Sequence, residues 1–275
     1  MTGPAVGHQA GNGPRRFVAP SWEQVDAARF RHPMFDGYRD YLDLMTATAW
    51  PKSDTLNRRM ALTGPRFVSQ DAALLADGLH YEARIAQGRI ATRPENWHDL
   101  FNAMVWMRHP DLKHALNRQQ CRYLERMGMR ERSPAQQALT QFDESGVIVQ
   151  VRDRELLDLW DRHDWVTLFH ANAGRWRDGD IAIAAVVGHA LMEQMLVPGR
   201  LLVGKCLVVL GEPVDAVARV VESIAAGASL VTPTELRPLP LAGIPGWHAG
   251  QDAAFYARQD YFRPRREGRV YPQPL

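Results

Sequence analysis

Apolar side chains recur every three or four residues between Asn96 and Pro110. Leu100, Met104 and Met107 fall on one stripe of this segment, which is the spacing of an amphipathic helix. Asn96 favours the N-cap position and Pro110 ends the pattern, so both boundaries of the helix are marked. The polar residues of the segment therefore gather on the opposite face of one helix.

Shorter patterns of the same kind predict further helices along the chain. Pro33 separates the first two of them, and Pro198 follows the helix that begins at His189. The helices that we expect are Trp22–Phe30, Met34–Ala47, Asp111–Arg126 with Gly128 as its C-terminal stop, Arg154–Arg162, Trp165–Ala171, His189–Leu196 and Val214–Ala226.

Two short β-hairpins are also expected. Leu79–Ile85 alternates between apolar and polar residues, and we expect it to pair with Arg89–Thr92. Gln137–Phe142 and Val147–Val151 flank the turn-forming segment Asp143–Gly146, which predicts the second hairpin. Three further segments stand out: Arg66–Ser69, a short strand, Ile181–Val187, a strand or a helix, and the apolar run Leu201–Leu210.

The two ends of the chain differ from its middle. Residues 1–20 are rich in Gly, Pro and Asn, which predicts a disordered N-terminal tail. From Thr232 onward Pro and Gly accumulate again, and we expect an ordered coil that wraps the surface. Hairpins mixed with helices, without a regular βαβ alternation, favour the α+β class. We therefore expect one helix-rich globular domain over residues 21–275, with short β-hairpins and a long C-terminal coil.

Composition narrows the classes of protein that fit. The chain has 275 residues, of which 45% are hydrophobic and 23% charged, so it can build a sizeable core. The net charge is +2, too small to attract nucleic acid by a general field. No run of about 20 apolar residues and no secretory h-region occurs, so we expect no membrane span and a cytoplasmic location. Two cysteines, Cys121 and Cys206, form no disulfide framework.

The polar face of the predicted helix at residues 96–110 carries the first candidate chemistry. His98, Asn102 and Trp106 are spaced four apart, and Asp99 lies beside them, so an imidazole, an amide, an indole and a carboxylate cluster within a few turns. Tryptophan on a fully solvated face is unfavourable, which indicates that this face lines a cleft. The alternative is structural: His98 bonds a neighbouring backbone group, and Asp99 favours the helix N-terminus through the macrodipole.

A second pair, His189 and Glu193, lies four residues apart in the apolar sequence GHALMEQML. The spacing resembles half of a helical metal motif, although the full HExxH pattern is absent. The alternative is a His–Glu hydrogen bond with no metal.

The third piece is the pair Asp143 and Glu144, which precedes Ser145-Gly146. Adjacent carboxylates before such a pair are typical of a solvated turn, because Asp bonds its own backbone there. The alternative is that one of them points into the cleft as a ligand or base.

If these pieces converge, they offer imidazole and carboxylate ligands that suit Zn, Mn or Fe. Such an ion lowers the pKa of bound water, so our leading hypothesis is a metal-dependent hydrolase. A site that holds both His98 and His189 requires them within about 12 Å, because metal–ligand distances are near 2 Å. The expected roles are catalytic for His98, Asp99 and Glu144, metal-ligating for His189, Glu193 and Asp143, and substrate-binding for Asn102, Trp106, Lys113, Asn117 and Arg93.

Two other functions stay open. A non-catalytic protein could bind a small molecule or peptide in the polar and aromatic pocket. His189 and Glu193 would then only support the wall of that pocket. Lys113 and Asn117 could hold an anionic group of a substrate in either case. Nucleic acid is the least favoured partner, because the arginine clusters are scattered among acidic residues and no known binding motif occurs. The clusters are Arg58 and Arg59, Arg130 and Arg132, and Arg263, Arg265 and Arg266.

The motifs GxGxxG, GxxxxGK[ST] and GxSxG are absent, so the sequence does not indicate a nucleotide-binding fold or an α/β-hydrolase. The combined pattern of the chain resembles instead the bacterial family called domain of unknown function 3025, from about Trp22 to Pro264. The resemblance implies a bacterial protein and no established catalytic residue. The residues that carry it are Tyr81-Glu82, Ile85, Gly88, Thr92-Arg93, Asn96 to Asn102, Trp106, Pro110, Lys113, Asn117, Phe142 to Gly146, Gly188 to Leu191, Glu193, Pro198, Gly243 to Trp247 and Phe262 to Pro264.

Overall fold

A four-stranded sheet forms one side of the molecule in the computed structural model, which describes residues 17–60, 64–127, 133–212 and 215–275. The strand order is β4 (Ile181–Val186), β3 (Gly146–Val151), β5 (Val203–Leu210), β6 (Arg237–Pro240). β3 pairs antiparallel with β4 and parallel with β5, and β5 pairs antiparallel with β6. Every residue of β3 is buried, which explains why its sequence is nearly all apolar.

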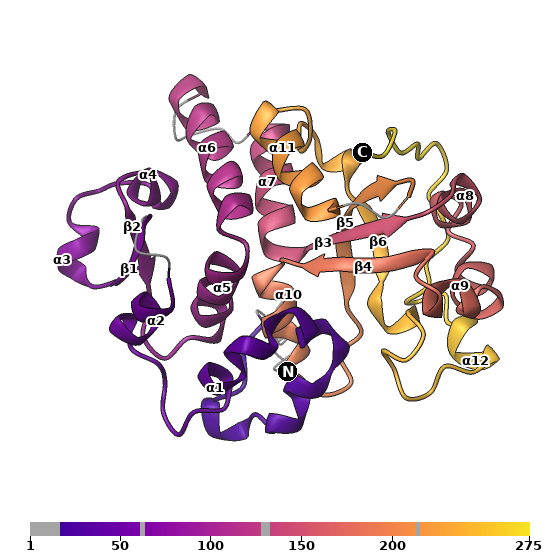
Figure 1. Ribbon diagram of the computed structural model, residues 1–275, viewed down its shortest axis with the longest axis horizontal. Helices are drawn as coiled ribbons and strands as arrows, with labels where there is room; N and C mark the ends of the chain where they lie inside the picture. Colours follow the sequence, from indigo (N-terminus) through magenta and orange to yellow (C-terminus); the bar gives the residue numbers. More distant parts are fainter. Residues whose placement is uncertain (1–16, 61–63, 128–132, 213–214) are drawn as a thin grey trace, which may run out of the picture.

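A second, two-stranded sheet lies on the other side of the molecule (Figure 1). Its strands β1 (Arg66–Ser69) and β2 (Arg89–Thr92) run parallel. Figure 1 shows the principal helices between this sheet and the larger one. They are α5 (Trp97–Arg108), α6 (Pro110–Met127), α7 (Pro134–Ser145) and α10 (His189–Met195), with α11 (Ala216–Ala226) packed against α6.

The remaining helices are short. They are α1 (Leu42–Met45), α2 (Ser53–Arg59), α3 (Ala72–Leu75), α4 (Tyr81–Ala86), α8 (Arg154–Asp161), α9 (Ala173–Arg177) and α12 (Ala253–Tyr256), with the tighter or wider turns η1 (Trp22–Gln24), η2 (Ala27–Arg31), η3 (Pro33–Tyr41), η4 (Val166–Ala171), η5 (Pro233–Glu235) and η6 (Leu241–Gly243). The α+β class is confirmed, and one hydrophobic core cluster joins buried residues from Phe30 to Phe262. None of the described helices is long and apolar enough to cross a membrane.

Helix α5 runs through this core, as its sequence pattern predicts. The Asn96 side chain caps the helix by accepting a hydrogen bond of 3.1 Å from the backbone N–H of Asp99. Leu100 and Met104 are fully buried, and the helix packs closely against α10. The cap and the apolar stripe together fix which way the polar face of α5 points.

The end of α7 meets the start of α10 with almost no space between the backbones. The N–H groups of Val187 and Gly188 both donate to the carbonyl of Gly146, each at 2.9 Å. A Cβ atom on Gly188 would lie 2.5 Å from Cα of Ser145, so this contact requires glycine. The close approach brings Glu144 of α7 beside His189 of α10.

Both predicted hairpins are wrong. Residues 79–85 do not form a strand: His80 caps a helix by accepting from the N–H of Glu82, and α4 follows. The strand at 89–92 exists, but its partner is the strand at 66–69.

The segment 137–142 lies inside α7 and is helical. Ser133 and Gln136 form a reciprocal capping box there, and Pro134 occupies the first turn, which are strong start signals for a helix. The predicted strand at 147–151 is confirmed as β3, and it pairs with β4 and β5.

Some other segments are ordered as predicted but differ from the prediction in the type of helix or strand that they form. The two N-terminal helices are mainly 3-10 turns, η1 to η3, and η4 is a π-helix. The predicted C-terminal coil contains β6 and α12. Most of the predicted N-terminal tail, the stop at Gly128, the Arg130 and Arg132 cluster and the start at Val214 lie outside the described residues.

Candidate metal centre

Two imidazole rings meet edge to face at the contact between α5 and α10. Nε2 of His98 lies 3.0 Å from Nε2 of His189, and the ring planes are 82° apart. The rings come from residues 91 positions apart in the chain. Their separation is far below the 12 Å limit for a shared metal site.

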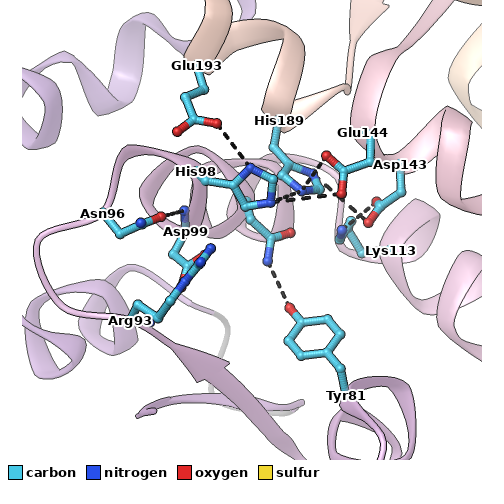
Figure 2. Close-up of polar contacts among 11 residues, drawn as sticks. Tyr81, Arg93, Asn96, His98, Asp99, Lys113, Asp143, Glu144, His189 and Glu193 are labelled. Atoms are coloured by element: carbon cyan, nitrogen blue, oxygen red, sulfur yellow. Dashed lines mark hydrogen bonds and ion pairs between the residues drawn. The ribbon is translucent and has the colours of Figure 1, made fainter. Parts of the chain in front are cut away.

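Glu144 of α7 completes a group of three. Its carboxylate oxygens lie 3.9 Å from Nε2 of His98 and 3.8 Å from Nε2 of His189 (Figure 2). One donor atom from each residue falls within 4.8 Å of the others. Ligands bound to one zinc ion at about 2.0–2.2 Å stand roughly 3.3–3.5 Å apart in a tetrahedron. The Glu144 side chain, which is 39% exposed, is free to close that small difference.

The far nitrogens of both rings face carboxylates. Nδ1 of His98 donates to Oε2 of Glu193 at 3.2 Å. Nδ1 of His189 lies 4.0 Å from Oδ2 of Asp143 and has no hydrogen bond of good geometry within the described part of the chain. Nζ of Lys113 donates to the other oxygen of Asp143 at 2.5 Å. A carboxylate behind a ring is the arrangement that orients metal-binding histidines, because it leaves Nε2 for the ion.

Burial and nearby charges shift the pKa values of the two histidines in opposite directions. Burial lowers the pKa of His189 to about 3, so its imidazole is neutral. Burial acts to lower the pKa of His98, but the hydrogen bond that His98 donates to Glu193 and the negative charge of Glu144 outweigh this effect, so the net shift of the pKa is upward. The two Nε2 atoms are 3.0 Å apart, which is hydrogen-bond distance, so one proton lies between the two rings. A cation between the rings would replace this proton.

His98, Glu144 and His189 line a cavity of about 380 Å³, which is within the size range of small-molecule sites. Helices α4, α5, α6 and α7 supply most of its wall. Each of the five residues expected to bind substrate lines it: Arg93, Asn102, Trp106, Lys113 and Asn117.

Asp99 lies on this wall but does not contact the imidazole pair. Its carboxylate accepts from the backbone N–H of Arg93 at 2.5 Å and from the guanidinium at 3.1 and 2.7 Å. Figure 2 shows Asp99 and Arg93 on the side away from Glu144. Asp99 thus fixes the loop before α5, and Arg93 already has an anionic partner.

Tyr81 and Glu82 of α4 belong to the cavity, and sequence reasoning did not place them there. The Tyr81 hydroxyl accepts from Nδ2 of Asn102 at 2.9 Å, and Nδ2 of Asn117 donates to the Glu82 carboxylate at 2.7 Å. Burial raises the pKa of Glu82 to about 7. The signal that could have found both residues is the family resemblance, which includes them, but the strand predicted over residues 79–85 put them on opposite faces.

Comparison with known families identifies the chain. A family model described as protein of unknown function DUF3025 matches residues 65–266, so the protein belongs to this family. The resemblance noted in the sequence is thereby confirmed. No curated protein and no solved structure matches the chain.

Proposed function

We propose that this protein is a metal-dependent hydrolase in which His98, His189 and Glu144 bind one divalent ion, either Zn, Mn or Fe. The single observation that carries the proposal is the pair of Nε2 atoms 3.0 Å apart, with a carboxylate near both. Two imidazoles and one carboxylate form a ligand set of catalytic zinc sites and also of iron(II) sites.

The roles differ from those expected from the sequence. We assign Glu193 and Asp143 to the far side of the rings, where they orient the imidazoles, and we assign His98 and Glu144 to the ion itself. Support comes from the contact between His98 Nδ1 and Glu193, and from Asp143, which lies behind His189 and is held by Lys113.

Three protein ligands leave a coordination position open for water. A bound ion would supply a nucleophilic hydroxide at neutral pH by lowering the pKa of that water. The cavity beside the group offers room for a small-molecule substrate.

Elemental analysis of the purified protein tests the proposal. We expect about one equivalent of a divalent metal per chain, lost from the His189→Ala variant and retained in His170→Ala, whose imidazole is exposed on η4. Chelator treatment should lower the melting temperature of the wild type alone. A protein free of metal, with unchanged stability in chelator, contradicts the proposal.

A non-catalytic binding protein is the second candidate. The cavity beside the imidazole pair is lined by the amides of Asn102 and Asn117 and by the indole of Trp106, a mixed polar and aromatic wall that suits a bound ligand whether or not it reacts. This candidate predicts that ligand affinity is the same before and after chelation.

We also propose that the protein acts in the cytoplasm. Cys121 and Cys206 are both free thiols, which supports a reducing compartment.

A further inference from the structure

A row of side chains on α6 leads away from the candidate metal centre along the cavity wall. Lys113, Asn117 and Gln120 share one face of the helix by their spacing, and all three line the cavity. The row begins beside the centre, because Nζ of Lys113 donates to Asp143, which lies behind His189. A ligand that extends from the centre along this row meets Asn117 one helix turn beyond Lys113, a distance of roughly 5 Å.

The carboxylate of Glu82, on α4, lies at this point of the wall. Its Oε2 accepts a hydrogen bond from Nδ2 of Asn117 at 2.7 Å, and the same Nδ2 donates to the Glu82 backbone carbonyl at 2.9 Å. Oε1 accepts no hydrogen bond from the described residues, and it keeps accessible surface, unlike the enclosed and unpaired Oδ1 of Asn102. Because the Glu82 side chain is only partly buried and lines the cavity, a ligand there can reach Oε1.

Ion pairs neutralise the other charged side chains around the cavity. The guanidinium of Arg93 donates to Asp99 at 2.7 Å, and Nζ of Lys113 donates to Asp143 at 2.5 Å. Glu144 faces the imidazole pair at 3.9 and 3.8 Å. Both permanently cationic side chains of the wall are thus bound to carboxylates, so the cavity disfavours an anionic ligand.

Glu82 is the carboxyl group of the wall that forms no ion pair within the described residues. Burial raises its pKa to about 7, and only the amide of Asn117 stabilises its charge at hydrogen-bond distance. A cation bound to Oε1 would offset this cost of burial. The expectation that Lys113 and Asn117 hold an anionic group is weakened, because both already donate to carboxylates.

We infer that the cavity binds a ligand with a cationic group, an ammonium or a guanidinium, that donates to Oε1 of Glu82. The amide of Asn117 holds the carboxylate for this contact, and the rest of the ligand extends along α6 toward the imidazole pair. As the substrate class of the hydrolase, the inference rests on the proposed function; as a binding site for an organic cation, it stands without the metal.

Calorimetric titration tests the inference at pH 8, where the Glu82 carboxyl is ionised. The probe is N-(4-aminobutyl)acetamide, whose amine is protonated at this pH, titrated into the full chain with and without chelator treatment. N-pentylacetamide, which carries a methyl group in place of the ammonium, is its uncharged counterpart. We expect the cationic probe to bind about tenfold more tightly, because hydrogen bonds between charged groups are the stronger ones.

The variant Glu82→Gln should remove this preference, and Glu125→Gln, which changes an exposed glutamate of α6, should keep it. The anionic probe 4-acetamidobutanoate should bind most weakly of the three. If the uncharged or the anionic probe binds the wild type as tightly as the cationic one, the inference is wrong, whether or not the Glu82 variant folds. A preference that survives in folded Glu82→Gln also overturns it.

The outcomes separate this inference from the metal proposal. If no probe binds while the protein holds its metal, the inference fails and the metal centre stands. If the cationic probe binds with the expected selectivity to a protein that is purified without metal and takes up none, the cation site stands and the hydrolase proposal fails.

Discussion

His98 can offer Nε2 to a metal only if something holds its other nitrogen. Glu193 does this through a 3.2 Å hydrogen bond to Nδ1, and its side chain is largely buried. Removing the negative charge makes Nε2 a weaker ligand and loosens the ring orientation.

We therefore expect Glu193→Gln to weaken metal affinity by about tenfold to a hundredfold without changing the stoichiometry. Calorimetric titration of metal into chelator-treated protein measures this. Glu222→Gln, an exposed glutamate on α11, is the matched control and should bind metal as the wild type does. A Glu193→Gln variant with unchanged affinity would contradict the role assigned to Glu193.

The protonation of Glu82 is coupled to folding. Burial raises its pKa from 4.5 in the unfolded chain to about 7, so the folded protein holds a proton that the unfolded chain releases. Its contribution to stability is fully present below pH 4.5 and is lost as pH rises through about 7.

We predict that Glu82→Gln removes this dependence. Between pH 4.5 and pH 8 the free energy of unfolding of the variant should gain on the wild type by on the order of 3 kcal/mol. Urea denaturation across this range measures the difference. Glu125→Gln, on the exposed side of α6, should show a constant difference from the wild type. A constant difference for Glu82→Gln as well would show that the carboxyl titrates normally.

At the scale of elements, the contact between α7 and α10 decides whether three ligands meet. Gly188 permits it, because a Cβ atom there would lie 2.5 Å from Cα of Ser145 and 2.6 Å from the backbone nitrogen of Gly146. Both obstacles are backbone atoms, so the helices themselves would have to separate.

Gly188→Ala should destabilise the protein by about 1–3 kcal/mol and weaken metal binding, since it moves His189 away from Glu144. Thermal melts and metal titration check the two effects. Gly174→Ala is the matched control: its Cβ meets nothing within 4 Å, and it lies in α9, so it should be neutral or slightly stabilising. Equal behaviour of the two variants would mean that the α7–α10 contact is not tight.

Secondary structure could be predicted from the sequence where the capping residues and the spacing of apolar residues indicate the same element. Helix α5 was predictable because its cap at Asn96 and its apolar stripe agree. The strand prediction within α7 failed because Gln137–Phe142 is too short to show a helical period. The whole helix shows it, since Ala135, Ala138, Leu139 and Phe142 are buried after the start signals at Ser133 and Pro134. The parallel pairing of β1 with β2 joins segments separated by two helices, and no local pattern encodes such a partner.

At the scale of the whole molecule, the fold brings together what the sequence could only propose. The sequence shows which polar residues share a face of α5 and of α10. It does not show that His98 meets His189, because these residues are 91 positions apart and come together only through the packing of the two helices. The roles proposed for Glu193 and Glu144 could not be predicted from the sequence, because side-chain geometry decides which carboxylate faces the ion and which supports a histidine ring.

If the proposal holds, metal binding stabilises the whole chain, because the proposed ligands come from three helices that meet only in the folded state. With free zinc at about a hundred times its dissociation constant, the free energy of unfolding should rise by about 2.7 kcal/mol. Chemical denaturation with and without zinc measures this, and His189→Ala should show no gain. A wild type that gains nothing from zinc would contradict the account.

The most direct test of the metal centre is a crystal structure of the zinc-loaded protein, with diffraction measured on both sides of the zinc absorption edge. We predict one anomalous peak about 2.0–2.2 Å from Nε2 of His98, Nε2 of His189 and an oxygen of Glu144, with Glu193 still bonded to Nδ1 of His98. An anomalous peak elsewhere, or none between two imidazoles that remain in direct contact, would contradict the central claim.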